Sequence, residues 1–111
     1  MTIEELNALG ANTTEGLARC AGMEAFYLQL IPKALDAGKY TELDNLLKEK
    51  KYDEAFEVAH SLKGVLANLS LTPVFEPVSE ITEGLRTKKD LNYEDLLNKM
   101  WDARNRFAEL L

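Results

Sequence analysis

The stretch AHSLKGVLANL, residues 59–69, contains the only histidine of the chain and a glycine within a run that has helical spacing. At about 100° of rotation per residue, the apolar residues in and just before this stretch fall on one side of a helix. That side consists of Ala55, Val58, Leu62, Val65, Leu66 and Leu69, with Ala59 at its edge. We therefore expect an amphipathic helix whose apolar stripe faces a core.

The histidine, His60, falls almost opposite this stripe and is predicted to face solvent. The same outer face carries Asp53, Phe56, Glu57, Lys63, Gly64, Ala67 and Asn68. A glycine inside a helix costs about 1 kcal/mol relative to alanine. Because Gly64 is predicted to face outward, packing against another helix does not explain why a glycine stands there. Its missing side chain leaves a notch that another backbone or a phosphoryl group can approach.

The outer face combines groups that suit phosphoryl transfer to a docked protein. An imidazole is a competent nitrogen nucleophile near neutral pH. Lys63 can bring a flexible positive charge near an anion held at His60. Phe56 is either an apolar anchor that a partner covers or a side chain that packs on the neighbouring helix.

Capping patterns and proline positions divide the rest of the chain into helices. Thr2 with Glu5, and Asn12 with Glu15, have the spacing of capping boxes and predict a short N-terminal helical extension. Residues 24–49 read as one long helix with a bend or as two helices in sequence, because proline and glycine interrupt the apolar period.

The remaining boundaries predict three further helices. The helix that contains the histidine begins near Tyr52 or Asp53. Thr72 is predicted as the N-cap of the next helix, with proline at its first position, and Asn92 with Asp95 as the cap of the last. We expect an all-α protein: a single domain over residues 1–111, built as an antiparallel four-helix bundle with a short N-terminal helical extension.

Composition excludes several classes of function. The 111 residues are 46% hydrophobic and 29% charged, as in an ordinary globular domain, and the formal net charge of −6 disfavours binding to nucleic acid. A lone Cys20 and a lone histidine do not form a metal-ligand cluster, and the unpaired cysteine suits a reducing compartment. No apolar run reaches the about 18 residues of a membrane span. We expect a cytoplasmic monomer that contacts no membrane.

The motif HSLKG at residues 60–64 resembles the H-x-L-K-G signature of histidine-containing phosphotransfer (HPt) domains. Ala59, Ala67, Asn68 and Leu69 around it, and the segment GLARCAGMEAFYLQLI at residues 16–31, also look like that family. One departure is Ser70, which stands where many members have a glycine at the end of this helix.

The resemblance implies a four-helix bundle that presents one histidine to the receiver domains of response regulators and hybrid histidine kinases. His60 would be phosphorylated, with Nε2 as the attacking atom, Lys63 would balance phosphate charge, and Gly64 would permit close approach. Arg86 would approach the site from the following helix. The docking residues would be Phe56, Glu57, Ala67 and Asn68. No cofactor and no ATP-dependent kinase activity are expected in this chain, with Mg²⁺ held by the partner receiver.

Two other interpretations stay open from the sequence. The chain could be a helical adaptor that docks signalling partners through the same face without being phosphorylated, or a domain cut from a larger hybrid or chemotaxis-type kinase. The combination of His60, Lys63 and Gly64 favours the phosphoryl carrier over the adaptor, because an adaptor needs none of them.

Overall fold

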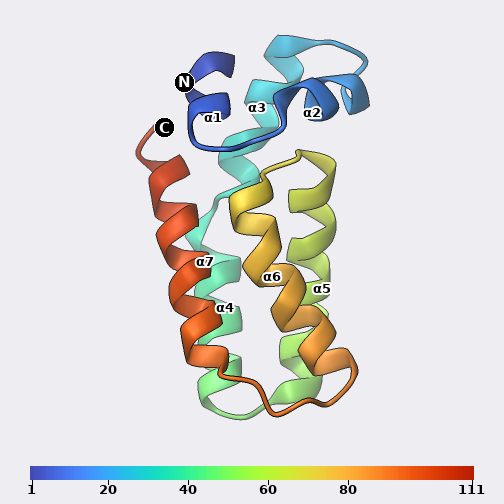
Figure 1. The fold of residues 1–111 in the computed structure, drawn as a ribbon, viewed down its shortest axis with the longest axis vertical. Coiled ribbons are helices and arrows are strands. Elements are labelled where there is room, and N and C mark those ends of the chain that lie inside the picture. The colour runs from blue at the N-terminus through green and yellow to red at the C-terminus, as the bar shows by residue number, and fades with distance from the viewer.

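The computed structural model describes residues 1–111 and contains helices and no strands. The helices are α1 (Ile3–Ala8), α2 (Thr13–Arg19), α3 (Glu24–Ala34), α4 (Ala37–Lys48), α5 (Tyr52–Asn68), α6 (Thr72–Arg86) and α7 (Tyr93–Ala108). Helices α4 to α7 form an antiparallel bundle in which each helix contacts the next and α7 returns beside α4 (Figure 1). The predicted four-helix bundle with a short N-terminal helical extension is confirmed.

The extension, α1 and α2, lies across one end of the bundle, near both chain termini (Figure 1). Both predicted caps are present there. Thr2 Oγ1 accepts a hydrogen bond from the Glu5 amide at 3.1 Å, and Asn12 Oδ1 accepts one from the Glu15 amide at 3.2 Å. These side chains satisfy amide groups that have no partner within the first turn of a helix.

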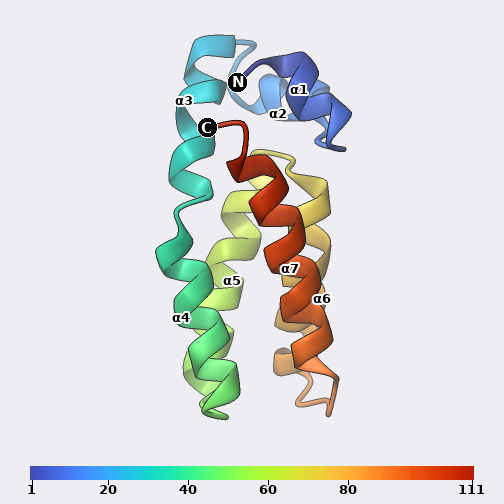
Figure 2. The ribbon, with the colours of Figure 1, turned by 90° about the vertical axis from the view of Figure 1, so that its left-hand side faces the viewer.

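Residues 24–49 form two helices rather than one bent helix. Figure 2 shows α3 above α4 along the same corner of the bundle, with a short break between them. The break falls at Leu35 and Asp36, and Asp36 Oδ1 caps α4 through the Gly38 amide at 3.2 Å. Arg104 of α7 donates from Nε and Nη2 to the Leu35 carbonyl oxygen at 2.9 and 2.6 Å, which satisfies a carbonyl that the broken helix leaves free.

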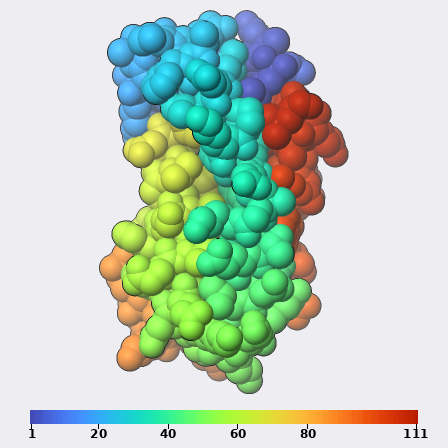
Figure 3. Space-filling view, turned by 180° about the vertical axis from the view of Figure 1, so that it is seen from behind, coloured from blue at the N-terminus to red at the C-terminus, as the bar shows by residue number.

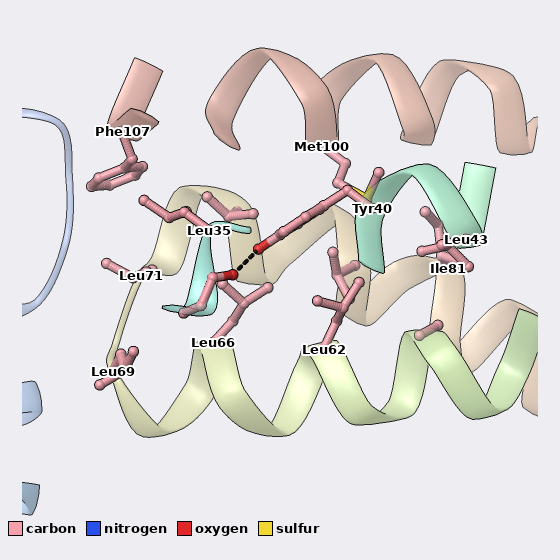
Figure 4. Close-up of a cluster of buried hydrophobic side chains, with 14 of the residues drawn as sticks. Leu35, Tyr40, Leu43, Leu62, Leu66, Leu69, Leu71, Ile81, Met100 and Phe107 are labelled. Atoms are coloured by element: carbon pink, nitrogen blue, oxygen red, sulfur yellow. Dashed lines mark hydrogen bonds between the residues drawn. The ribbon is translucent and has the colours of Figure 1, made fainter. Parts of the chain in front are cut away.

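The interior of the bundle is one contiguous cluster of apolar side chains, to which every helix except α2 contributes buried residues; Figure 4 shows part of it. Tyr40 lies fully buried within it, and its Oη donates to the Ala34 carbonyl oxygen at 2.8 Å. Burial raises the pKa of the Tyr40 phenol, so the side chain stays a neutral hydrogen-bond donor. Leu62 and Leu66 extend from α5 into the same cluster (Figure 4), as their place on the apolar stripe predicts.

Two sequence predictions are wrong in detail. Val65, predicted in the core, is 41% exposed, because the neighbouring helices leave this edge of the apolar stripe uncovered at its position. Thr72 is not an N-cap. The N-cap of α6 is Leu71, whose carbonyl oxygen accepts from the amides of Val74 and Phe75, so Thr72 is the first helical residue. The Asn92 cap is confirmed at 3.1 Å from the Asp95 amide.

Ser70, two residues after the end of α5, has a backbone conformation that favours glycine. Its φ is 55°, in the left-handed region. Its amide donates to the Ala67 carbonyl and the Leu71 amide to the Leu66 carbonyl, each at 3.1 Å, which is the hydrogen-bond pattern of a Schellman motif. Arg19 of α2 donates from Nη1 to both Ser70 Oγ and the Ala67 carbonyl at 2.7 Å, so the N-terminal extension braces this turn.

Candidate functional site

His60 lies near the middle of α5 on the outer face of the helix and is exposed. The residues that flank it along the apolar stripe, Ala59 and Leu62, are buried. Figure 3 shows α5 beside α4 on the surface of the bundle, with the N-terminal extension confined to the far end. The predicted outward direction of the histidine is therefore confirmed, and no other element of the chain covers it.

The imidazole is held against an aromatic ring one turn earlier on the same helix. The Phe56 and His60 rings are stacked, with centroids 5.7 Å apart and planes inclined by 12°. On α6, the Arg86 guanidinium carbon lies 5.1 Å from the centroid of the Phe56 ring, in cation–π range. Phe56 is half-buried and contacts the core, so it packs between the two helices as well as beside the histidine.

The lysine of the HSLKG motif forms an ion pair across the two helices. Lys63 Nζ lies 3.2 Å from Glu83 Oε2, and Arg86 Nε lies 3.3 Å from the same oxygen. The hydrogen bond from Lys63, followed by that from Arg86, lowers the pKa of the Glu83 carboxyl, which therefore stays ionised near neutral pH. These contacts link His60 through Phe56 and Arg86 to Glu83 and Lys63.

Sequence reasoning missed Glu83. The one signal in the sequence was its position three residues before Arg86 on a predicted helix, where opposite charges can meet. That spacing accounts for the contact with Arg86 only. The contact with Lys63 depends on how α5 and α6 pack against each other.

Gly64 leaves open space on the outer face. A Cβ atom built at Gly64 would have no neighbour within 4 Å, and the residue is exposed. Gly16 is the opposite case, since a Cβ there would lie 2.6 Å from Tyr27 Cε1 and 2.9 Å from the Leu69 carbonyl oxygen. The chain therefore needs Gly16 for packing but has no packing need for Gly64.

The other predicted docking residues extend along α5 on both sides of the histidine. Glu57 and Asn68 are exposed, and Ala67 is half-buried. A groove of about 670 Å³ opens beside Phe56 and Glu57, between the start of α5 and the turn after α6. Its charged lining consists of Asp53, Glu57, Asp90, Arg86, Lys88 and Lys89. The groove reaches the Phe56 end of the face and does not include Ala67 or Asn68.

No group of three or more His, Cys, Asp or Glu side chains is arranged as a metal site would require. None of the helices combines the length and apolar composition needed to cross a bilayer.

A protein-family model described as "Hpt domain" matches residues 27–109. The chain therefore belongs to the Hpt domain family, whose members act in histidine phosphotransfer within phosphorelays and interact with receiver domains of two-component systems. The match begins in α3 and covers the four-helix bundle, so residues 16–26 of the segment that resembles the family lie outside it. No curated protein and no solved structure matches the chain.

Proposed function

We propose that this protein is a phosphoryl carrier that accepts a phosphoryl group on His60 from the aspartate of one receiver domain and passes it to another. The observation that carries the proposal is the position of His60, the only histidine, exposed on α5 with open space at Gly64 one turn later. Membership of the Hpt domain family supports the same reaction class.

The proposed transfer exchanges one bond to phosphorus for another. The lone pair of His60 Nε2 attacks the phosphorus in line with the leaving oxygen, while the proton of the neutral ring stays on Nδ1. The P–O bond to the aspartate breaks, and the carboxylate leaves with the electron pair. Positioning and charge stabilisation supply most of the catalysis in such transfers. We expect the Mg²⁺ in the acidic pocket of the receiver.

The remaining residues of the site support the transfer in different ways. Lys63 supplies positive charge one turn from the imidazole, and Gly64 allows the receiver backbone to approach. Phe56 orients the imidazole by stacking and presents its edge to the partner, together with Glu57, Ala67 and Asn68. Arg86 reaches the site from α6 through its contact with Phe56.

A two-receiver chase tests the carrier role. A receiver domain carrying a labelled aspartyl phosphate is mixed with the protein, and a second, unlabelled receiver is added afterwards. The proposal predicts label on the protein and then on the second receiver, with no label on the protein from ATP alone. Binding to receivers without any label on the protein would contradict the proposal and favour the adaptor interpretation.

A further inference from the structure

We infer that Glu83 is a positioning residue of the phosphoryl site, which holds Lys63 and Arg86 beside His60 and competes with the phosphoryl group for both cations. One carboxylate oxygen, Oε2, contacts both cations, at 3.2 Å to Lys63 Nζ and 3.3 Å to Arg86 Nε. Neither cation has another ion-pair partner in the chain. The inference deepens the proposed function and rests on it.

Lys63 can exchange Glu83 for a phosphoryl group at little cost. Its side chain is 28% exposed, and that of Glu83 is 50% exposed, so water screens the ion pair between them. Exposed ion pairs of this kind contribute little to stability. A phosphoryl group carries about −1.5 to −2 charges, against −1 for a carboxylate, and therefore attracts the lysine more strongly. The flexible lysine stem lets Nζ move between the two anions.

Arg86 is held in a way that leaves its other donors free. The Nε atom bonds to Glu83 and the guanidinium lies over the Phe56 ring, which is stacked on His60. The Nη1 and Nη2 atoms donate no hydrogen bond within the chain. Glu83 thus keeps a planar, multidentate cation close to the site before the phosphoryl group arrives.

Phosphorylation changes the role of Glu83 from partner to competitor. Once Lys63 and Arg86 turn toward the phosphoryl group, two anions, the phosphoryl group and the Glu83 carboxylate, compete for these two side chains. Its negative charge raises the free energy of the phosphorylated form and favours onward transfer. Asp53 and Glu57, on the outer face of α5, also contribute negative charge near the site. Their charge is the same in the wild type and in a Glu83 variant.

The test compares Glu83→Gln with the matched variant Glu80→Gln, which removes an exposed carboxylate one turn earlier on α6. His60 is phosphorylated chemically with phosphoramidate, so the test requires no receiver. In the step, the new Nε2–P bond replaces the P–N bond of the reagent, and ammonia leaves. The phosphoryl signal is then followed by ³¹P NMR as a function of pH.

We expect the protonation midpoint of the phosphoryl group to fall in Glu83→Gln and to stay at the wild-type value in Glu80→Gln. With a receiver present, the transfer equilibrium should shift about two- to fivefold toward the phosphorylated protein, the scale of one exposed ion pair. The Glu83→Gln shift should shrink in the Lys63→Ala background, because Glu83 acts through that lysine. Equal midpoints in Glu83→Gln and wild type would overturn the inference. A wild-type protein that takes phosphoramidate label but none from receivers would instead refute the proposed function.

Discussion

On the inner face of α5, Leu62 and Leu66 are almost completely buried, whereas on the outer face His60 and Gly64 are exposed. The inner residues contact side chains from other helices of the bundle (Figure 4). On the outer face, a Cβ atom at Gly64 would have no neighbour within 4 Å, and the Phe56 ring stacks on His60. Under the proposed function, stability depends on the inner face and phosphoryl transfer on the outer face, so substitutions should separate the two.

The largest expected effect is on the inner face. Leu66 is fully buried, so Leu66→Ala should lower the free energy of unfolding by about 2–5 kcal/mol. Its neighbour Val65 is 41% exposed, and Val65→Ala should change stability by about 0.5 kcal/mol or less. Urea denaturation of the two variants measures the difference. Equal losses would mean that the buried stripe of α5 is misplaced.

The next largest effect is on the outer face, where a substitution should slow phosphoryl transfer without lowering stability. Gly64→Gln fills the open space at the notch and should slow transfer from a receiver by about 100-fold, because small displacements of reacting groups are this costly. Stability should stay unchanged or rise by up to about 1 kcal/mol, since glycine is a poor helix former. Rapid-quench transfer assays and thermal melts test both parts. Transfer at the wild-type rate would refute the role of the notch.

A smaller effect is expected at Lys63. Lys63→Ala removes the flexible charge near the phosphoryl group and should slow transfer about two- to fivefold, and the phosphohistidine should hydrolyse faster. The control is Lys99→Ala, which removes an exposed lysine from α7, a helix that does not carry the site. If the two variants behave alike in both measurements, Lys63 has no specific role.

The smallest effect is expected where α5 ends. Ser70→Gly relieves a left-handed backbone but loses the hydrogen bond from Arg19 to Ser70 Oγ. Because Arg19 keeps its bond to the Ala67 carbonyl, the backbone gain should dominate and stabilise the protein by about 0.5 kcal/mol. Phosphotransfer should be unchanged. A lower melting temperature would show that the bond to the serine hydroxyl outweighs the strain.

Local patterns in the sequence predict much of the fold and of the outer face. The helical period places His60 outside and Leu66 inside, and short-range capping spacing locates the starts of α1, α2 and α7. The HSLKG motif then places Lys63 and Gly64 on the same helix as the histidine. All of these signals depend on residues a few positions apart.

The parts that sequence reasoning missed or left open depend on contacts between distant segments. The break at Leu35 is supported by Arg104, 69 residues further along the chain. The Glu83 contact with Lys63 depends on the relative rotation of α5 and α6, which no local period contains. The exposure of Val65 likewise depends on which neighbours cover the edge of the stripe.

The most direct test of the central claim compares the wild-type protein with His60→Gln in phosphotransfer from a phosphorylated receiver domain, with thermal melting measured alongside. Because His60 is exposed and is not among the buried core residues, the free energies of unfolding of the two proteins should agree within about 0.5 kcal/mol. The wild type should take up label that is stable to alkali and labile to acid, and the variant should take up none. Label of the same kind and amount on the His60→Gln variant would contradict the assignment of the outer face of α5 as the phosphoryl site.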